Sequence, residues 1–369
     1  MSTSISGREL FEQRLGALQA GIDSARERSG AAVAERIERR AVTLREVAEA
    51  SGVSISTVSR ILDDRIPQSR SSTAERVRQT ADALGYRRNA AASGLRRGAT
   101  GTIGVLVPRL TDTVMALMFE ALERAARTRG YFAVVATSGD EPDEERRATE
   151  TLLDRGVDAV ILATARLGDL LPASLRDRGI PHVLVLRSDG VSPSSLGDDE
   201  MGGYLAVRHL VDLGHRDIAV VTGPDFTSSA RARLAGALRA TTEAGWEPPP
   251  GRVIAGGYGV DDGVAAGDAL FRTGDAPTAV FAANDNIALG VLAAANTAGL
   301  RIGADVSVVG YNDIPLASRL PVPLSSVRVP FDQIATTAFE LLQSDTGGGA
   351  GAVRKALPTL IPRASTRPR

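Results

Sequence analysis

Residues 102–137 read TIGVLVPRLTDTVMALMFEALERAARTRGYFAVVAT and show the unit from which most of the chain is built. A short apolar run, TIGVLVP, precedes an amphipathic stretch that ends at Gly130, and a second apolar run, YFAVVAT, follows. Short apolar runs bounded by turn residues predict buried strands, and an apolar period near 3.6 residues predicts a helix. A strand, a helix and a strand in this order predict two parallel strands of one sheet.

The same alternation continues toward the C-terminus. Six further apolar runs are predicted strands: VDAVILAT (157–164), PHVLVL (181–186), DIAVVTG (217–223), RVIAGG (252–257), TAVFAAND (278–285) and VSVVGYND (306–313). Eight strands are enough for two parallel α/β sheets with helices on both faces. Polar residues end several of the runs, and open α/β sheets bind ligands beyond the carboxyl ends of their strands. We therefore expect a binding cleft at that edge.

The segment from Thr43 to Tyr86 has a different pattern, with three short predicted helices and no strand. Within TLREVAEASGVSISTVSRIL, a small core can form from Leu44, Val47, Ala48, Val53, Val58 and Ile61. Gly52 supplies a turn and Ser54 is a predicted N-cap, which together indicate a helix-turn-helix. The outward residues of the second helix suit a DNA major groove: Ile55, Ser56, Thr57, Ser59 and Arg60. Arg60 is the best candidate for a guanine contact.

The distribution of charge supports this hypothesis. The whole chain carries a net charge of −1, whereas residues 43–98 hold ten arginines against six acidic residues. Arg87, Arg88, Arg96 and Arg97 follow one another with no acidic residue between them. Such a strip can neutralise phosphates and make binding dependent on salt. The alternative is a solvated linker.

Composition bounds the remaining possibilities. The sequence contains no cysteine, which excludes disulfides and thiolate metal sites and fits a reducing compartment. It shows neither a secretory signal nor a run of ~20 apolar residues, so we expect a cytoplasmic, nucleoid-associated protein without a membrane segment. In residues 1–42, an apolar stripe predicts an extra helix, and a partly disordered leader is the alternative. This leader is assigned no chemistry.

Many blocks in order resemble the lactose-repressor (LacI/GalR) family of bacterial regulators. The similarity spans residues 43–366 and rests on TLREVAEASGVSISTVSRIL, ALGYRRNAAASGLRRGATGTIGVLVP, HLVDLGHRDIAVVTGP, RLAGAL, PTAVFAANDNIALGVL, VSVVGYND, PLSSV and ALPTLIPRAST. It implies an α/β fold with an all-α helix-turn-helix head and a two-lobed domain like a periplasmic binding protein. The expected parts are an N-terminal extension (1–42), a DNA-binding domain (43–88), a hinge (89–100) and an effector-binding and dimerisation domain (101–369).

The resemblance also assigns roles at the DNA. It implies that Ile55 and Ser56 select operator base pairs and that Arg60 contacts guanine. Phosphate-contacting or helix-positioning roles fall to Thr43, Ser54, Thr57 and Ser59. In the hinge, Asn89, Ala92 and Leu95 are expected at the DNA, with Leu95 as a wedge in the minor groove. Gly94 costs about 1 kcal/mol in a helix relative to alanine, and Arg88 stands where proline is frequent, so hinge folding is expected to be weaker.

For the effector, the resemblance implies a cleft between the lobes that binds a small molecule. The expected effector-binding residues are Arg187, Asp198, Arg233, Asn284, Asp285 and Asn312. Asp112 to Met115 replace a frequent Asn-Pro-Phe-Phe, which reduces aromatic stacking, and a pentose or hexose derivative remains the expected ligand. The family also implies a homodimer on a pseudo-palindromic operator, acting as a repressor, with no cofactor or metal. The effector and DNA are then linked reciprocally, typically by ~1–3 kcal/mol.

Two other classes of protein fit the sequence less well. An enzyme is disfavoured because Lys355 is the single lysine and neither GxxxxGK[ST] nor GxSxG occurs. The three histidines (His182, His209, His215) lack metal-ligand spacing and are predicted to be structural. The glycine-rich run GGYGVDDG (256–263) is interpreted as a turn. A stand-alone binding protein of the periplasmic type would need an export signal and would lack the helical head.

Overall fold

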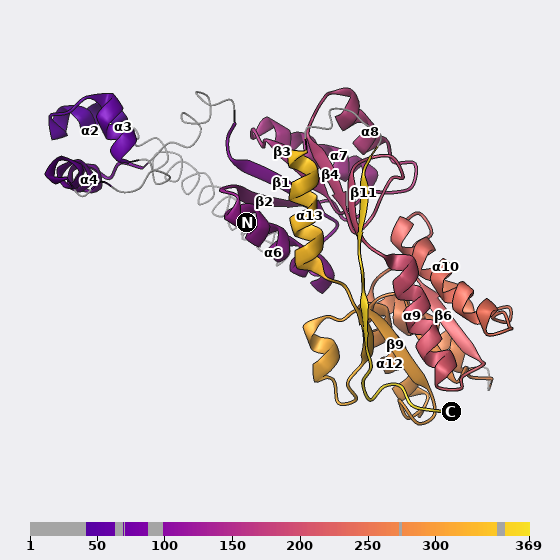
Figure 1. The fold of residues 1–369 in the computed structure, drawn as a ribbon. Coiled ribbons are helices and arrows are strands. Elements are labelled where there is room, and N and C mark those ends of the chain that lie inside the picture. The colour runs from indigo at the N-terminus through magenta and orange to yellow at the C-terminus, as the bar shows by residue number, and fades with distance from the viewer. Residues whose placement is uncertain (1–41, 63–68, 70, 88–98, 273–274, 345–350) are drawn as a thin grey trace, which may run out of the picture. The chain divides into compact units, whose positions relative to one another are not determined.

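The computed structural model describes residues 42–62, 69, 71–87, 99–272, 275–344 and 351–369. The chain divides into two compact units, residues 1–92 and 93–369. We call the described part of the first unit the head and that of the second the body (Figure 1). The predicted leader helix and the hinge residues Asn89, Ala92 and Leu95 lie outside the described residues. Within these ranges, no helix combines the length and apolar character that spanning a bilayer requires.

The head consists of three helices: α2 (Leu44–Ser51), α3 (Ile55–Ile61) and α4 (Ser72–Leu84). Thr43 and Glu46 form a reciprocal capping box at the start of α2, which satisfies two free backbone N–H groups. Gly52 ends α2 with φ 67°, a left-handed conformation that glycine adopts without strain. The predicted turn and the predicted N-cap Ser54 are therefore confirmed.

A small apolar core holds the three helices together. Val47, Val58 and Val77 are fully buried, one from each helix, with Ala48 and Ala81 beside them. Leu44, Val53 and Ile61 pack against this cluster, as predicted. Arg76 on α4 donates from Nε to the carbonyl of Ser51 at 3.2 Å, which fixes α4 against the end of α2. The second helix, α3, is thus buried along one side and exposed along the other.

The body contains two parallel sheets of six strands each, in separate lobes. Sheet 1 has the order β11-β5-β4-β3-β1-β2. Its strands are β1 (Thr102–Val107), β2 (Phe132–Thr137), β3 (Ala159–Leu162), β4 (His182–Val185), β5 (Ser194–Gly197) and β11 (Val353–Ala356). Its helices are α6 (Thr113–Thr128), α7 (Pro142–Asp154), α8 (Leu170–Asp177) and α13 (Phe331–Gln343). Together they form lobe 1.

Sheet 2 has the order β12-β10-β9-β8-β6-β7 and forms lobe 2. Its strands are β6 (Ile218–Thr222), β7 (Val253–Ala255), β8 (Ala279–Ala282), β9 (Ser307–Asn312), β10 (Ser325–Arg328) and β12 (Thr359–Ile361). Its helices are α9 (Asp199–Asp212), α10 (Ser228–Glu243), α11 (Val260–Phe271) and α12 (Asp285–Thr297), with a short 3-10 helix at Pro315–Arg319. β12 is antiparallel to β10, whereas the other strands of this sheet pair in parallel.

The chain passes between the lobes three times. The crossings lie between β5 and α9, between β10 and α13, and between β11 and β12. They run close together, because Asp198 donates its backbone N–H to the carbonyl of Ala356 at 2.8 Å and a Cβ on Gly197 would lie 3.7 Å from Val329. Figure 1 shows α13 and β11 against lobe 1, although both follow most of lobe 2 in sequence.

Close packing of α9 on α10 depends on two glycines. A Cβ on Gly203 would lie 2.0 Å from the carbonyl oxygen of Arg233, and one on Gly236 would lie 1.9 Å from that of Glu200. Real Cβ atoms do not tolerate such distances, so the two backbones meet only because no side chain intervenes. This approach places Arg233 of α10 next to the first turn of α9.

Candidate functional site

The first candidate site is the exposed side of α3 in the head. Ser54, Ile55, Ser56 and Arg60 are exposed, and Ile55 keeps 42% of its surface accessible although it is a large apolar residue. Among the described residues, Arg60 forms no ion pair and no side-chain hydrogen bond, so its guanidinium is free to bind a partner. Four of the predicted DNA-contacting residues are therefore exposed together on α3 and its N-cap.

Hydroxyl groups order the start of this helix. The Oγ of Ser54 accepts a hydrogen bond from the backbone N–H of Thr57 and lies 2.8 Å from the Thr57 hydroxyl and 2.9 Å from that of Ser56. Thr57 and Ser59 are half-buried, and Thr43 caps α2. Ser54, Thr57 and Thr43 thus position helices as well as offering polar groups. Asn89, Ala92 and Leu95 are outside the described residues, so their placement stays a prediction.

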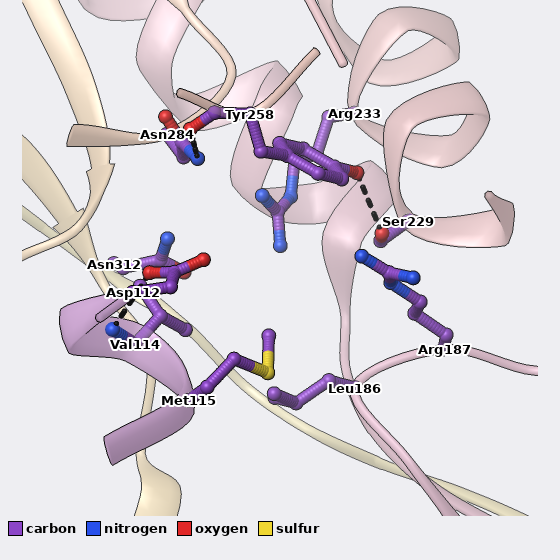
Figure 2. Close-up of a pocket in the computed structure, with 10 residues that line it drawn as sticks. All are labelled: Asp112, Val114, Met115, Leu186, Arg187, Ser229, Arg233, Tyr258, Asn284 and Asn312. Carbon is purple, nitrogen blue, oxygen red and sulfur yellow. Dashed lines mark hydrogen bonds between the residues drawn. The ribbon is translucent and has the colours of Figure 1, made fainter. Parts of the chain in front are cut away.

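The second candidate site is a pocket between the lobes of the body (Figure 2). Loops at the carboxyl ends of the strands and the starts of helices line it, as the cleft was predicted to be. Its ten lining residues are Asp112, Val114, Met115, Leu186, Arg187, Ser229, Arg233, Tyr258, Asn284 and Asn312. Arg187, Arg233, Asn284 and Asn312 were predicted effector-binding residues, and the structure brings these four together.

Arg233 lies at the base of the pocket in a buried ion pair. Its Nε donates to Oδ1 of Asp199 at 2.7 Å, and its Nη1 donates to the carbonyl of Ala283 at 2.6 Å. The guanidinium also lies 3.8 Å from the ring centroid of Tyr311, a cation–π contact. Burial lowers the pKa of Arg233, but the Asp199 carboxylate together with Tyr311 and Tyr258 raises it above its ordinary value, so the guanidinium stays charged. The positive charge at the base of the pocket is already paired.

Arg187 lies on lobe 1 and is also paired. Its Nη1 donates to Oδ1 of Asp140 at 2.8 Å, and only 3% of the residue surface is exposed. The guanidinium lies 5.5 Å from the ring centroid of Tyr258, which belongs to lobe 2. Next to it, the backbone N–H of Ser188 donates to the hydroxyl of Ser228 at 2.8 Å. These contacts join the two lobes at the pocket.

Asp112 introduces an acidic group that carries no ion pair. It is the N-cap of α6 and accepts on Oδ1 from the backbone N–H of Val114 at 3.0 Å. The same oxygen accepts from Nδ2 of Asn286, on lobe 2, at 3.3 Å. Burial raises the pKa of Asp112, and these hydrogen bonds oppose the shift. No donor among the described residues contacts its other oxygen, Oδ2.

The two asparagines of the pocket differ in their freedom to bind. Asn284 caps α12, because its Oδ1 accepts from the N–H of Ile287 at 2.7 Å and its Nδ2 donates to the carbonyl of Tyr258 at 3.0 Å. The amide of Asn312 makes no hydrogen bond within the described part of the chain, although only 4% of the residue is exposed. Asn312 also has φ 98°, so the backbone turns sharply as β9 ends. A buried amide without a partner favours a ligand at this position.

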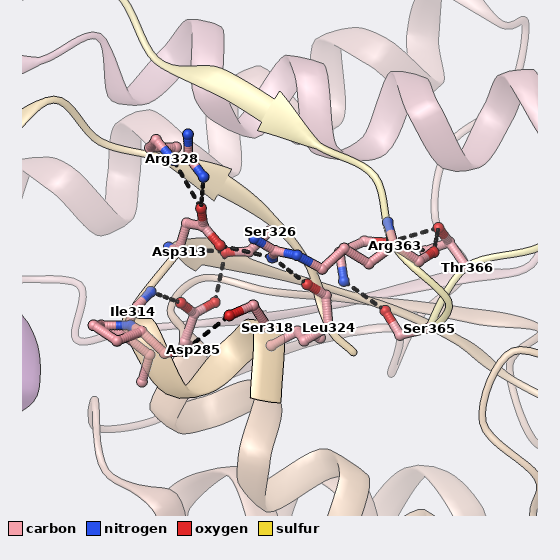
Figure 3. Close-up of polar contacts among 12 residues, drawn as sticks. Asp285, Asp313, Ile314, Ser318, Leu324, Ser326, Arg328, Arg363, Ser365 and Thr366 are labelled. Carbon is pink, nitrogen blue, oxygen red and sulfur yellow. Dashed lines mark hydrogen bonds and ion pairs between the residues drawn. The ribbon is translucent and has the colours of Figure 1, made fainter. Parts of the chain in front are cut away.

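Two predicted effector-binding residues do not line the pocket. Asp198 caps α9 by accepting from the N–H of Met201 at 3.3 Å, and it lies 3.5 Å from Nζ of Lys355 at the crossings. Asp285 points into lobe 2, where it accepts from the hydroxyl of Ser326 at 2.6 Å and the N–H of Ile314 at 2.7 Å (Figure 3). Burial raises the pKa of Asp285 to about 7. Both residues face structural partners because a cap or a strand end competes for the carboxylate.

Three polar residues of the pocket are not among the predicted effector-binding residues: Asp112, Ser229 and Tyr258. Asp112 lies in the loop between the end of β1 at Val107 and α6, so the rule that ligands bind beyond the strand ends would have found it. Tyr258 lies within GGYGVDDG, which does turn into α11 but also presents an aromatic ring to the pocket. The hydroxyls of Tyr258 and Ser229 are hydrogen-bonded at 3.1 Å. Tyr258 directly follows the predicted strand 252–257, so the same rule would have found it, whereas no local pattern of the sequence marks Ser229.

The inner pocket opens into a wider outer groove. Asp112, Arg187 and Tyr258 line both spaces, and the groove continues past Arg109, Arg166 and Phe226. The cavity volume accessible to water is about 30 Å³ in the pocket and about 370 Å³ in the groove. Arg166 lies 4.1 Å from the ring centroid of Phe226 across the two lobes. A ligand larger than a few atoms would extend from the pocket into this groove.

The histidines occupy structural positions. His215 is hydrogen-bonded to Thr278, Ser307 and the carbonyl of Arg367, and His209 to Thr366. Burial lowers the pKa of both imidazoles, which favours their neutral forms at pH 7. Within the described ranges, no three histidine, aspartate or glutamate side chains are grouped so as to hold a metal ion.

Two segments of the chain match known families. Residues 43–89 match the family described as bacterial regulatory proteins, lacI family, and residues 207–366 match the periplasmic binding protein-like domain. The HTH-type transcriptional repressor PurR of Vibrio campbellii is 32% identical over 306 residues, which are 81% of this chain and 90% of that protein. Catabolite control protein A of Priestia megaterium is 31% identical over 304 residues, which are 82% of this chain and 91% of that protein.

Solved structures show the same similarity. The lac repressor dimer bound to operator and the anti-inducer ONPF has a TM-score of 0.78 and 29% identity, and the match covers 89% of this chain and all of that one (100%). The complex of the transcriptional regulator CelR with cellobiose has a TM-score of 0.67 and 30% identity, with 88% and 99% covered. The sequence similarity and the fold therefore agree over the head and the body.

Proposed function

Because the chain belongs to the LacI family of bacterial transcriptional regulators, we propose that it is a repressor that binds a specific DNA operator. Its affinity for the operator is controlled by a small molecule bound between its lobes. Members of this family are DNA-binding regulators and not enzymes. The observation that carries the proposal is the exposed face of α3, where Ile55, Ser56 and the unpaired Arg60 stand together.

The proposed DNA contacts follow from the chemistry of that face. Arg60 supplies two parallel donors for the O6 and N7 of guanine, and Ile55 supplies an apolar surface for a thymine methyl. Thr43, Ser54, Thr57 and Ser59 offer hydroxyls for phosphates, which fix the register of the helix without selecting bases. Asn89, Ala92 and Leu95 complete the interface at the hinge, with Leu95 inserted between base pairs.

The proposed effector site is the pocket between the lobes. Support comes from the polar groups of Asp112, Asn312 and Arg233, which converge on one space, and from the contacts of Arg187 with Tyr258 across the lobes. A ligand that binds there changes the balance between lobe arrangements only as far as it binds one of them more tightly. The proposed ligand is a sugar or sugar derivative, a class for which cellobiose in the related CelR complex is a precedent.

We further propose that the protein acts as a homodimer on a pseudo-palindromic operator in the cytoplasm. The related lac repressor binds its operator as a dimer. Two heads related by a two-fold axis would contact the two half-sites of the operator. Each small three-helix head would then need to recognise only one half-site.

A binding assay with the full-length protein tests the proposal. Genomic fragments, including the promoter of the protein's own gene, are incubated with the protein at low and at physiological salt, and retained fragments are sequenced. The expected result is one or a few fragments that share a pseudo-palindrome, with affinity falling as salt rises. Retention of no fragment at low salt, with or without added sugars, would contradict the function.

A further inference from the structure

The charges at the effector pocket sum to a negative value once the carboxylates paired with its two arginines are counted. Arg233 and Arg187 both line the pocket, but each is already neutralised by its own carboxylate: Asp199 at 2.7 Å for Arg233 and Asp140 at 2.8 Å for Arg187. Asp112 has no such partner within the described residues, because its only hydrogen bonds come from Val114 and Asn286. The arginines of this pocket are therefore not available as bare cations for an anion.

The outer groove carries the same sign. Its lining contains Asp112, Asp140, Glu141 and Asp262 against Arg109, Arg166 and Arg187. Of these arginines, Arg187 is paired with Asp140, and Arg166 lies 3.9 Å from the buried carboxylate of Glu145 behind the groove. Arg109 is exposed and bonded to the carbonyl of Gly139. An anionic group thus meets excess negative charge in both spaces that a ligand can enter.

Helix N-termini are the groups that would favour an anion here. α6, α10 and α12 begin at the pocket, and each N-terminus carries roughly half a positive charge. Each is already capped by its own side chain, however: Asp112 for α6, Thr227 for α10 and Asn284 for α12. Each cap engages one backbone N–H of its helix, and a full carboxylate charge at contact distance outweighs the partial charges that remain.

The polar groups that remain free require a different ligand. Oδ2 of Asp112 accepts hydrogen bonds only, and the Asn312 amide can both donate and accept. Val114, Met115 and Leu186 line the rest of the lobe 1 side with apolar surface. A hydroxyl beside a C–H surface satisfies all three features, because it donates to the carboxylate and accepts from the amide.

We propose that the effector is an uncharged polyhydroxylated compound that donates a hydroxyl hydrogen bond to Oδ2 of Asp112, and that Asp112 excludes phosphorylated and carboxylated ligands. This inference rests on the proposed effector site and narrows its ligand class. Asp112 acts as a specificity-determining residue, because its carboxylate accepts a hydrogen bond from a ligand hydroxyl and repels a negatively charged group at the same position.

The first test is a panel of matched probes. Melting temperature and calorimetric affinity are measured for full-length protein with glucose, galactose, ribose, cellobiose and maltose, and with glucose 6-phosphate, ribose 5-phosphate, glucuronate and galacturonate. The proposal expects at least one neutral member to bind and each anionic counterpart to bind at least 100-fold more weakly. A panel with no neutral binder, or with an anionic member that binds more tightly than its neutral counterpart, would overturn it.

The second test changes the charge without changing the fold. Asp112→Asn keeps the size and the N-cap, and Asp112→Ser serves as a second capping variant. For the neutral ligand, Asp112→Asn is expected to weaken binding about 10-fold, and the neutral-to-anionic preference should fall at least 10-fold. Asp212→Asn, on the exposed end of α9, makes the same charge change elsewhere and should leave both values unchanged. An unaltered preference in both folded Asp112 variants would contradict the role of Asp112.

DNA release separates this inference from the function. If the protein binds an operator and an anionic sugar releases it, the proposed function stands and the ligand class is wrong. If a neutral sugar binds but no DNA is retained, the ligand class stands and the function is wrong.

Discussion

The guanidinium of Arg233 and the carboxylate of Asp199 are joined at 2.7 Å, and 8% of each side chain is exposed. Asp199 lies in the first turn of α9 and Arg233 in α10, and the two helices approach closely enough for this contact because Gly203 and Gly236 lack side chains. The second donor of the guanidinium reaches the end of β8 at Ala283. A residue that the family resemblance assigns to the effector is therefore also a structural link within lobe 2.

Arg233→Met should reveal this structural role. The substitution leaves the Asp199 carboxylate buried without its cation, which typically costs 3–5 kcal/mol. We expect a fall of about that size in the free energy of unfolding, measured by urea denaturation of the full-length protein. The double variant Asp199→Asn/Arg233→Met removes both charges and should recover part of the loss. Equal stability of the single variant and the wild type would show that the pair contributes nothing.

Arg60→Ala should weaken operator binding by about 1–3 kcal/mol, because a bidentate guanine contact is lost. Fluorescence anisotropy with the selected operator and with a scrambled duplex measures the effect. Arg127→Ala, on an exposed position of α6, removes the same charge from the body and serves as the control. Equal losses for the operator and the scrambled duplex would indicate a phosphate contact instead of base recognition.

Leu95→Ala should reduce specific binding and DNA bending while leaving non-specific binding nearly intact. The reason is that an apolar wedge unstacks a base step and the bend is repaid by added protein contacts. Bend angles from circular-permutation or energy-transfer assays measure it. An unchanged bend would remove the wedge from the proposed DNA interface.

Glu145→Gln should change how stability depends on pH. Burial, followed by the nearby charge of Asp169, raises the pKa of Glu145 to about 7, and only 1% of the residue is exposed. The folded state therefore binds this proton more tightly than the unfolded state, so the stability contributed by Glu145 is complete below about pH 4.5 and is lost as pH rises through about 7. Glutamine cannot ionise, so the variant should be stabilised relative to the wild type at pH 8 by on the order of 2 kcal/mol.

Melting curves of both proteins from pH 5 to pH 8 measure this difference. Only the difference between them is diagnostic, because Asp285 has a similarly raised pKa and the buried histidines add an opposite trend at low pH. A difference that stays constant across this range would contradict the raised pKa of Glu145.

Periodicity identified the strands that carry a clear apolar run and missed the others. All eight predicted strands form, whereas β5, β10, β11 and β12 were not predicted. The sequences SSLG, SSVR, VRKA and TLI are three or four residues long, and none contains more than two consecutive apolar residues, so no apolar run marks them. They become strands because each pairs with a neighbour already in its sheet: β5 and β10 lie beside β4 and β9, and β11 and β12 complete the edges, which is a property of tertiary structure.

The residues of the pocket likewise divide into those that the sequence could predict and those that it could not. Asn284 and Asn312 could be predicted because they end strands whose carboxyl edges form the cleft. Asp198 and Asp285 also end strands or begin helices, but a cap and a hydrogen-bonded strand end engage their carboxylates. Tyr258 follows the predicted strand 252–257 and could have been found in the same way, whereas Ser229 lies in the first turn of α10, which no apolar run marks.

The threefold passage of the chain between lobes has a consequence for biosynthesis. α13 and β11 of lobe 1 lie more than a hundred residues after β5, behind nearly the whole of lobe 2. When β1 to β5 have left the ribosome, the sheet of lobe 1 still lacks its edge strand β11 and its helix α13. Most of lobe 2 is synthesised before these two elements. Lobe 1 therefore reaches its final form only after most of lobe 2 has been translated, and a transcript truncated before codon 353 would yield a nascent chain with an open sheet edge of the kind that promotes aggregation.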